Sequence, residues 1–177
     1  MNWPVVALFF LLSGCASMND ALTPSPSTLK DDFDGTTIVR QPPVGASSSF
    51  SEPIHSLGFE WFTRDPGRVY LNVGAHFSAR TGGMTGLSFN ADGEIFRAEQ
   101  SNPFTKRERD IYKESSRFSV TFDQFQRIAS AQVVKMRVDG LGEATVSSFG
   151  PRTGSGAQVT LKFAPFLEQI RAARVKR

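Results

Sequence analysis

Two histidines and several carboxylates are the residues of this sequence that could carry catalytic chemistry. His55 and His76 could each join a serine and an acid in a Ser–His–Asp arrangement, in which the imidazole takes the serine proton. The chain contains no Gly-x-Ser-x-Gly segment, the turn that presents a nucleophilic serine in many hydrolases. Glu60 could pair with Glu94 or Glu99 for acid–base catalysis, but such chemistry depends on a separation that sequence spacing does not give. The simpler interpretation is a loop histidine, a histidine on the polar face of a strand, and surface charge.

Metal-binding chemistry has little support in the sequence. The chain has one cysteine and two histidines, which excludes an internal disulfide framework and thiolate-rich zinc sites. Asp31, Asp32 and Asp34 precede Gly35 as in a calcium loop with oxygen ligands, but the twelve-residue EF-hand spacing with its closing glutamate is absent. We therefore expect these acids to form a solvated turn, and we predict no metal ion and no non-covalent cofactor.

Two glycine-rich segments could hold an anion. Residues 80–86 (RTGGMTG) and 150–156 (GPRTGSG) each combine arginine, threonine and glycine, as phosphate-binding loops do. Neither is a P-loop, because no Gly-Lys-Ser/Thr follows the glycines. Turns between strands also require glycine. Arg80 and Arg152 are therefore candidate binding residues for a phosphate or an anionic glycan, beside the simpler interpretation of two turns.

The N-terminus carries a short apolar segment followed by small residues. Residues 3–12 (WPVVALFFLL) are too few for the roughly 20 residues of a membrane-spanning helix, but they are typical of the central region of a signal peptide. The segment ends at Leu12 and is followed by Ser13, Gly14 and Cys15. Small side chains at positions 13 and 14 would let a peptidase approach an extended backbone.

The residues Leu12 to Cys15 (LSGC) resemble the lipobox of bacterial lipoproteins, in which an aliphatic and two small residues precede a lipidated cysteine. The resemblance implies that residues 1–14 are a signal peptide and that Cys15 carries a covalent diacylglycerol and acyl chain. Two or three chains make a stable membrane anchor, at ~0.8 kcal/mol per buried methylene. In this family an aspartate after the cysteine retains the protein at the inner membrane, whereas Ala16 and Ser17 follow here. The resemblance therefore implies an outer-membrane lipoprotein that faces the periplasm.

The positive charge of the chain is concentrated at its C-terminus. The net charge is +3, from 20 basic and 17 acidic residues. Residues 171–177 hold four of the basic residues and no acid, so the remaining sequence is nearly neutral. Arg171 and Arg174 could bind anionic headgroups or an acidic partner from the end of a terminal helix, or they could solubilise a frayed end. An exported protein on a lipid anchor does not meet nucleic acid as its normal ligand, so we expect no nucleic-acid partner.

Three stretches lack the apolar periodicity of a helix or a strand. Residues 15–30 are small, polar and proline-containing, which predicts a lipidated terminus and a flexible tether of up to ~50 Å at ~3.3 Å per residue. This tether would carry a single periplasmic domain, residues 31–177. Residues 41–56 predict a long surface loop, and the strongly charged residues 100–117 predict an exposed excursion with a helical turn.

Apolar and polar residues alternate in several short segments, which is typical of half-buried antiparallel strands. The alternation is longest over residues 69–77, where it places His76 on the polar face. Residues 86–89 and 94–97 flank an Asp-Gly turn, and residues 132–139 and 143–149 flank a glycine-rich turn, so both pairs predict β-hairpins. Further short strands are predicted at residues 36–40, 58–63, 118–121 and 158–163.

Two segments have helical spacing. Thr121 with Gln124 has the form of a capping box, and the apolar residues that follow predict a helix through Ala131. Pro165 can begin a C-terminal helix at its first position, where the missing N–H has no cost. The predicted buried stripe of that helix is Phe166, Leu167, Ile170 and Ala173.

The order of these elements predicts an α+β fold, in which an antiparallel sheet, sandwich-like or curved, carries one inserted short helix and a C-terminal helix. With 16 phenylalanines in the chain, we expect aromatic packing to dominate the core.

The sequence favours a non-enzymatic lipoprotein that binds an envelope protein, peptidoglycan or anionic lipid at the outer membrane. The strand with Trp61 and Phe62, together with the loops at Arg80 and Arg152, is the candidate binding region. The alternative is an envelope hydrolase or a small-ligand carrier that uses the face of His76. An enclosed pocket that holds His76 beside a serine or an acid would favour this alternative.

Overall fold

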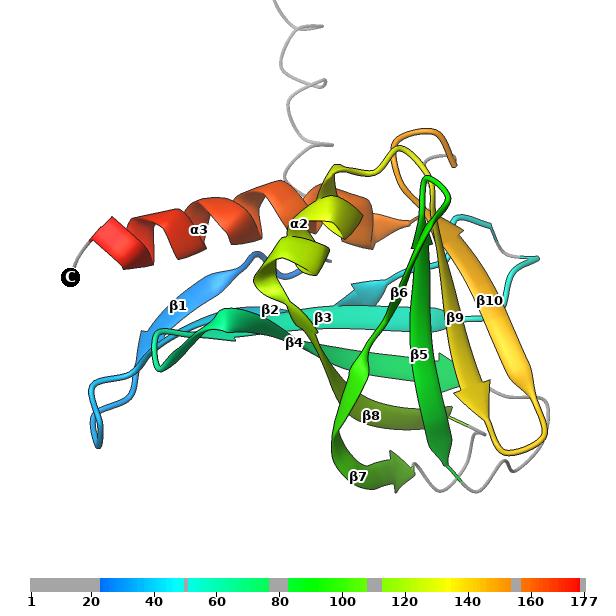
Figure 1. Ribbon diagram of the computed structural model, residues 1–177, viewed down its shortest axis with the longest axis horizontal. Helices are drawn as coiled ribbons and strands as arrows, with labels where there is room; N and C mark the ends of the chain where they lie inside the picture. The colour runs from blue at the N-terminus through cyan, green and yellow to red at the C-terminus, as the bar shows by residue number, and fades with distance from the viewer. Residues whose placement is uncertain (1–22, 50, 77–82, 108–112, 154–156, 176–177) are drawn as a thin grey trace, which may run out of the picture.

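Alternating apolar and polar residues form strands that pair into two antiparallel sheets in the computed structural model (Figure 1). The structure describes residues 23–49, 51–76, 83–107, 113–153 and 157–175, without the side chains at positions 76, 102–107 and 113. Within these residues, a larger sheet has six strands and a smaller sheet has four, and they are joined by a short inserted helix and a C-terminal helix. The predicted α+β fold with an antiparallel sheet is confirmed.

The larger sheet has the strand order β1-β2-β3-β4-β8-β7. Its described strands are β1 (Ser27–Lys30), β2 (Thr37–Gly45), β3 (His55–Phe62), β4 (Asp65–His76), β8 (Lys113–Thr121) and β7 (Glu99–Arg107). In β3, the side chains of Leu57, Phe59 and Trp61 point to one side and are buried, because alternate residues of a strand face the same side of a sheet.

The smaller sheet has the order β10-β9-β5-β6 and contains both predicted hairpins. Its described strands are β10 (Ala144–Phe149), β9 (Val134–Gly140), β5 (Met84–Ala91) and β6 (Glu94–Arg97). The turn between β5 and β6 places Asp92 and Gly93 at φ values of 50° and 101°, the left-handed region that an Asp-Gly pair adopts readily in tight hairpins. The chain continues from β6 into β7, which joins the two sheets.

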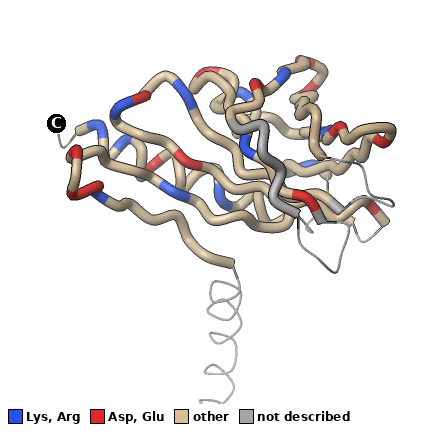
Figure 2. Tube along the Cα trace, turned by 90° about the horizontal axis from the view of Figure 1, so that it is seen from below, with Lys and Arg blue, Asp and Glu red and all other residues tan. Residues whose placement is uncertain are grey.

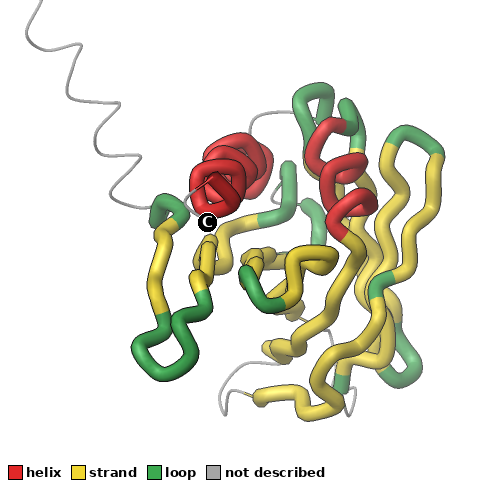
Figure 3. Tube along the Cα trace, turned by 60° about the vertical axis from the view of Figure 1, so that its left-hand side comes forward, coloured by secondary structure: helices red, strands yellow, loops and turns green. Residues whose placement is uncertain are grey.

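Both predicted helices are present. Helix α2 (Phe122–Ser130) begins with the predicted capping box, in which the Gln124 N–H donates to Thr121 Oγ1 at 3.2 Å and the Thr121 N–H donates to Gln124 Oε1 at 3.0 Å. Helix α3 (Phe163–Val175) begins two residues before Pro165. Figure 3 shows the two helices beside each other on the same side of the strands, and their Phe125 and Phe166 rings lie 5.6 Å apart.

Five phenylalanines from every layer of the fold meet in one buried aromatic cluster. The ring of Phe59 in β3 lies 5.0 Å from Phe125 of α2. It also lies 4.9 Å and 5.3 Å from the rings of Phe163 and Phe166 in α3. The Phe163 ring lies 5.8 Å from Phe149 of β10, which extends the cluster into the smaller sheet. The prediction that aromatic packing dominates the core is confirmed at this cluster.

The segment predicted as a last strand is instead the 3₁₀-helix η1 (Gln158–Lys162), so that prediction is wrong. In a 3₁₀-helix, residues three apart share a face, and Val159 and Lys162 are the two buried residues of η1. The Lys162 ammonium reaches the carbonyl oxygen of Thr23 at 3.1 Å, which satisfies its buried charge with an acceptor. Over only five positions, the pattern of apolar residues is compatible with both a strand and a 3₁₀-helix, so the sequence did not distinguish them.

Two predicted irregular stretches contain strands. The predicted loop at 41–56 is wrong at both ends, because Gln41 to Gly45 continue β2 through a register shift around two prolines, and His55 and Ser56 begin β3. The predicted excursion at 100–117 is wrong where β7 and β8 pair at the edge of the larger sheet. An edge strand is exposed to solvent and often carries charged residues. These residues interrupt the alternation of apolar and polar side chains by which a strand is recognised in a sequence.

The predicted tether is shorter than the sequence indicates. Ser27–Lys30 forms β1 and pairs with β2, so the prediction of a flexible segment through Lys30 is corrected. Side-chain amides hold the preceding prolines, since Gln41 donates to the Pro24 carbonyl at 3.0 Å and Gln169 donates to the Pro26 carbonyl at 2.7 Å. The chain is therefore joined to the domain from position 23 onward.

The Phe59→Ala substitution is expected to destabilise the protein strongly. It removes a fully buried ring from the aromatic cluster, and such truncations cost about 3–5 kcal/mol. The matched control is Phe33→Ala, because Phe33 is fully exposed and its loss should change the free energy of unfolding by less than about 0.5 kcal/mol. Chemical denaturation of both variants measures the difference. Equal stabilities would contradict the central position of Phe59 in the core.

Candidate functional site

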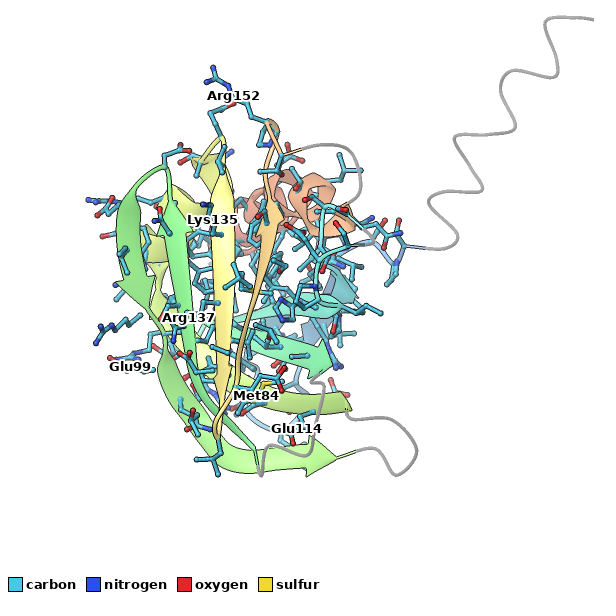
Figure 4. The ribbon with its side chains drawn as sticks, turned by 90° about the vertical axis from the view of Figure 1, so that its right-hand side faces the viewer. Met84, Glu99, Glu114, Lys135, Arg137 and Arg152 are labelled. Atoms are coloured by element: carbon cyan, nitrogen blue, oxygen red, sulfur yellow. The ribbon has the colours of Figure 1, made fainter. Side chains whose placement is uncertain are left out.

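The outer face of the smaller sheet is hollowed. A depression of about 630 Å³ lies over this face, which we call the sheet hollow. Figure 4 shows Lys135 and Arg137 on the strands of this sheet. Along the middle of the sheet, the exposed or half-buried residues of β5 are short: Thr85, Gly86, Ser88 and Asn90. The side chain of Asp139 lies close to Gly86. Long side chains stand on the neighbouring strands on both sides. The hollow therefore forms because the outward side chains of β5 are shorter than those of the strands on either side. Its described lining is Thr85, Gly86, Leu87, Ser88, Phe89, Asn90, Ile95, Arg97, Ala98, Lys135, Arg137, Asp139 and Val146.

Strand register brings three basic residues around this floor. Ser88 pairs with Arg137 of β9 on one side and with Arg97 of β6 on the other. Asn90 pairs with Lys135 of β9 in the next outward-facing row. Neighbouring strands lie about 4.8 Å apart, so the Cα atoms of Arg97 and Arg137 are separated by about 10 Å across the strand that carries Ser88.

The lining of the sheet hollow carries an excess of positive charge, with three basic residues and one acid, Asp139. Arg137 Nε contacts Asp139 Oδ1 at 2.7 Å, which leaves both terminal amino groups of the guanidinium for other acceptors. Neither Arg97 nor Lys135 forms an ion pair with an acid in the described part of the chain. The nearby carboxylate of Glu94 is turned to Arg127 of α2, at 2.6 Å. The hollow is therefore suited to an anionic ligand.

The end of the smaller sheet is held by a carboxylate. Asp92 accepts hydrogen bonds from the backbone N–H groups of Gln132 at 2.9 Å and Val133 at 2.8 Å. These two bonds hold the pKa of Asp92 below its usual value, with a smaller contribution from the charge of Arg152. Arg152 is exposed beyond the ends of β9 and β10, and Figure 4 shows it away from Lys135 and Arg137. Arg152 is therefore at the end of the sheet, outside the lining of the hollow.

The predicted binding strand contributes little accessible surface. Trp61 is only 1% exposed, and its indole N–H donates to the Pro66 carbonyl at 3.2 Å. Phe62 is half-buried on the opposite side of β3, where the guanidinium groups of Arg64 and Arg117 lie 5.3 Å and 5.6 Å from its ring. Trp61 therefore belongs to the core, and Phe62 is covered by Arg64 of the turn after β3 and by Arg117 of β8.

The basic residues of α3 differ in their surroundings. The Arg174 guanidinium lies 4.2 Å from the Phe122 ring and 5.4 Å from the Trp61 ring, and it donates to the Pro66 carbonyl at 3.2 Å. Arg174 therefore packs the C-terminal end of α3 against β3 and α2. Arg171 is exposed and remains available to a partner. Neither residue lies in the lining of the sheet hollow.

Several other candidate residues lie outside the described residues. These are the lipidation and lipobox residues and the arginine of the first glycine-rich segment: Leu12, Ser13, Gly14, Cys15 and Arg80.

His55 is a structural residue of the core rather than a loop histidine. It is 1% exposed, and its ring nitrogens lie 2.7 Å from Ser147 Oγ and 2.8 Å from Thr145 Oγ1. Both hydroxyls belong to β10, so this imidazole joins the larger sheet to the smaller one. The backbone of His76 pairs with Lys113 at the end of β4, while its side chain is outside the described residues.

The proposed carboxylate pairs are not brought together as an acid–base site. Glu60 lies between Arg40 at 3.2 Å and Arg117 at 2.7 Å on the outer side of the larger sheet. Glu94 pairs with an arginine of α2, and Glu99 pairs with Arg68. In the view of Figure 2, basic and acidic positions are intermingled along the trace rather than gathered by sign. Surface ion pairing, the simpler interpretation, accounts for these three acids.

The acidic turn near the N-terminus has the hydrogen bonds of a turn. Asp31 Oδ1 accepts from the Phe33 N–H at 2.9 Å, and Asp34 Oδ1 accepts from the Thr36 N–H at 2.8 Å. Among the described residues, no three histidine, cysteine, aspartate or glutamate side chains gather as metal ligands. None of the described helices has both the length and the apolar character that a membrane crossing requires.

Residues 46–49 and 51–54 lie beside β10, the first edge of the smaller sheet. Glu52 Oε2 accepts from the N–H and the hydroxyl of Ser48, at 2.9 Å and 3.1 Å, and from the Ser148 N–H of β10 at 3.2 Å. Partial burial opposes the charged form, but the hydrogen bonds from Ser148 and Ser48 outweigh it and hold the pKa of Glu52 below its usual value. An adjacent depression of about 290 Å³ is lined by this segment and His55.

Sequence reasoning did not identify the sheet hollow, although one signal for it was present. The predicted strand 132–139 alternates apolar residues with Lys135 and Arg137, and outward-facing positions of the neighbouring hairpin are the small residues Gly86 and Ser88. The register that sets these residues beside one another is a long-range pairing between β5 and β9. The depression could not be predicted without knowledge of that pairing.

Comparisons with known proteins add no family assignment. The scan against protein-family models found no match, and the search of curated proteins found no similar sequence. Function is therefore inferred from the residues themselves.

The Glu52→Gln substitution is expected to lower stability at neutral pH and to weaken its dependence on acid. Because the pKa of Glu52 is lower in the folded than in the unfolded protein, its contribution is complete above the unfolded-state pKa. That contribution disappears as the pH falls through the folded-state pKa. Urea denaturation at several pH values should therefore give curves for wild type and Glu52→Gln that converge on acidification. Parallel curves would contradict this role of the carboxylate.

Proposed function

We propose that this chain is a lipid-anchored protein of the bacterial outer membrane that binds another envelope component without catalysing a reaction. The observation that carries the proposal is the sheet hollow, in which Arg97, Lys135 and Arg137 surround the small polar floor at Ser88. A positive, open depression of this kind binds ligands by charge and hydrogen bonding. It supplies a binding surface on a protein that otherwise has a tightly packed core.

The lipobox resemblance supports the anchored state. Cys15 would carry the diacylglycerol and acyl chain, and the described fold begins at Thr23, where Lys162 holds its carbonyl. The segment from position 15 to position 23 spans at most about 29 Å when fully extended. The proposed anchor would therefore hold the domain close to the periplasmic surface of the outer membrane.

A binding role fits the described side chains better than hydrolysis does. Each ring nitrogen of His55 is bonded to a hydroxyl group inside the core, where the ring is removed from any substrate. In the described part of the chain, the lining of the sheet hollow includes no histidine and only one carboxylate, Asp139, which is paired with Arg137. No observation favours the hydrolase or ligand carrier that would use His76.

The Cys15→Ser substitution is expected to abolish lipidation. The thiol is the group that would accept the diacylglycerol, so cells given a labelled fatty acid should incorporate label into wild type and into the control Ser17→Ala, but not into Cys15→Ser. The resemblance also implies that Ala16→Asp keeps its lipid but moves from the outer-membrane to the inner-membrane fraction. Labelled Cys15→Ser protein in the membrane fraction would contradict the anchor.

Reversal of charge in the sheet hollow is expected to abolish binding of the partner. In-cell crosslinking of the lipidated protein, followed by gentle detergent extraction and mass spectrometry, should give reproducible adducts with one envelope component. The variant Lys135→Glu/Arg137→Glu should reduce these adducts at least tenfold, because its two side chains would repel the anion that they bind in the wild type. The matched control is Lys30→Glu/Arg171→Glu, which makes the same change of charge at exposed positions outside the hollow.

The two double variants separate the possible surfaces. Loss of adducts in Lys135→Glu/Arg137→Glu alone supports the sheet hollow. Loss in the control alone would overturn it in favour of the C-terminal helix with Arg171. Unchanged adducts in both variants, or migration of the wild-type protein only as a monomer, would also overturn the proposal.

A further inference from the structure

We infer that the sheet hollow binds a carboxylate-bearing glycopeptide, the chemistry of a short fragment of the peptide-crosslinked cell wall. This inference rests on the proposed binding function and names its ligand class. It follows from the size of the hollow, the chemistry of its floor and the placement of its cations.

The size of the hollow fits a short oligomer. Its volume of about 630 Å³ lies within the range of about 300–1,000 Å³ that is typical of small-molecule sites. A folded protein partner would need a patch of about 800 Å² with an apolar centre. Here the centre is the polar floor formed by Ser88 and Asn90, and the exposed apolar residues lie apart from each other on the two outer strands.

The floor of the hollow is suited to hydroxyl and amide groups. The Ser88 hydroxyl forms no hydrogen bond within the described residues and can both donate and accept. The Asn90 side-chain oxygen accepts from the Gly93 N–H at 2.8 Å, which leaves its amide N–H groups as donors. Sugars and peptides present hydroxyl, acetamido and amide groups at close spacing, so they can satisfy this floor along its length.

The cations are placed for carboxylates. A guanidinium group can hold a carboxylate through two parallel hydrogen bonds. Arg97 and Arg137 face each other across Ser88, so a carboxylate between them could be held from both sides. Lys135 is two residues from Arg137 along β9, about 7 Å away, and could hold a second carboxylate. A ligand with two acidic groups about 7–10 Å apart therefore fits better than one with a single charge.

Exposed apolar residues stand at opposite corners of the hollow. Val146 pairs with Arg137 at the β10 side and is 44% exposed, and Ile95 pairs with Asn90 at the β6 side and is 68% exposed. They can cover methyl groups, which acetylated sugars and alanine-containing peptides carry. Neither residue has a packing role that requires it to be apolar, since both face outward.

A membrane surface fits the hollow less well than a soluble oligomer. Headgroup phosphates of a bilayer form a plane, which is reached by cations that project from a convex or flat surface. The floor at Ser88 is recessed between Arg97 of β6 and Arg137 of β9, and the side chain of Asp139 lies close to the neighbouring Gly86. A plane would contact the tips of these side chains and leave the floor empty, whereas an extended oligomer can enter it.

The ligand class can be tested by calorimetric titration of the full, lipidated protein in detergent micelles. The probe is a disaccharide–peptide fragment released from cell wall by a muramidase, beside the same fragment with its carboxylates converted to amides. We expect the free acid to bind at least tenfold more tightly than the amide and to weaken as salt screens the cations. Equal affinities for the acid and the amide would overturn the inference.

A steric variant tests the location without changing charge. Ser88→Phe should reduce affinity for the free-acid fragment at least tenfold, because an aromatic ring would fill the floor of the hollow. The matched control is Ser27→Phe, at an exposed strand position of the larger sheet, which should bind as the wild type does. Circular dichroism spectra of both variants establish that each is folded. Wild-type affinity in folded Ser88→Phe would overturn the location.

Failure of this inference differs from failure of the proposed function. If in-cell crosslinks depend on Lys135 and Arg137 but the free-acid fragment does not bind, the glycopeptide inference is wrong and the binding function stands. The same result together with Lys135-dependent binding to phosphatidylglycerol vesicles would assign the hollow to lipid. If the crosslinks do not depend on these residues, the proposed function fails first.

Discussion

The arrangement of both sheets and both helices depends on the aromatic cluster around Phe59. This ring contacts α2 through Phe125 and α3 through Phe163, and the ring of Phe163 reaches Phe149 of the smaller sheet. Edge-to-face and offset stacked rings contribute about 0.5–1.5 kcal/mol per pair beyond the burial of their area. Because one cluster receives a ring from every layer, the inner face of the smaller sheet is fixed in the core. Its outer face is then necessarily turned to solvent, where the sheet hollow lies.

The same alternation that builds the core also builds the hollow. In β5, Leu87 and Phe89 face inward while Ser88 faces outward, and in β9 Met136 faces inward while Lys135 faces outward. A slip of one residue in the pairing of these strands would exchange the two faces and bury charge in the core. The packing of the core therefore sets the strand register, and this register places the basic residues of the proposed binding surface.

Local patterns predict this fold better than they predict its surface. The Asp-Gly hairpin and the capping box at Thr121 were predictable because their signals lie within a few residues of each other. The 3₁₀-helix η1 and the edge strands were not, because their structure depends on distant partners such as the Thr23 carbonyl that receives Lys162. Trp61 was selected for its residue type, which suits a core as well as a binding surface. The sheet hollow depends on lateral register across four strands, which no local pattern encodes.

The packing of η1 and α3 also sets where the described chain begins relative to the hollow. Thr23 accepts from Lys162 of η1, and Pro26 accepts from Gln169 of α3, so the first described residues lie beside these two helices. The smaller sheet, whose outer face carries the hollow, and most of α3 lie on opposite sides of the molecule in Figure 1. A short anchor attached at the helix side would bring that side toward the membrane without covering the hollow. The proposed anchor and the proposed ligand would therefore occupy different surfaces, and attachment through the anchor would leave the smaller sheet open to the proposed periplasmic partner.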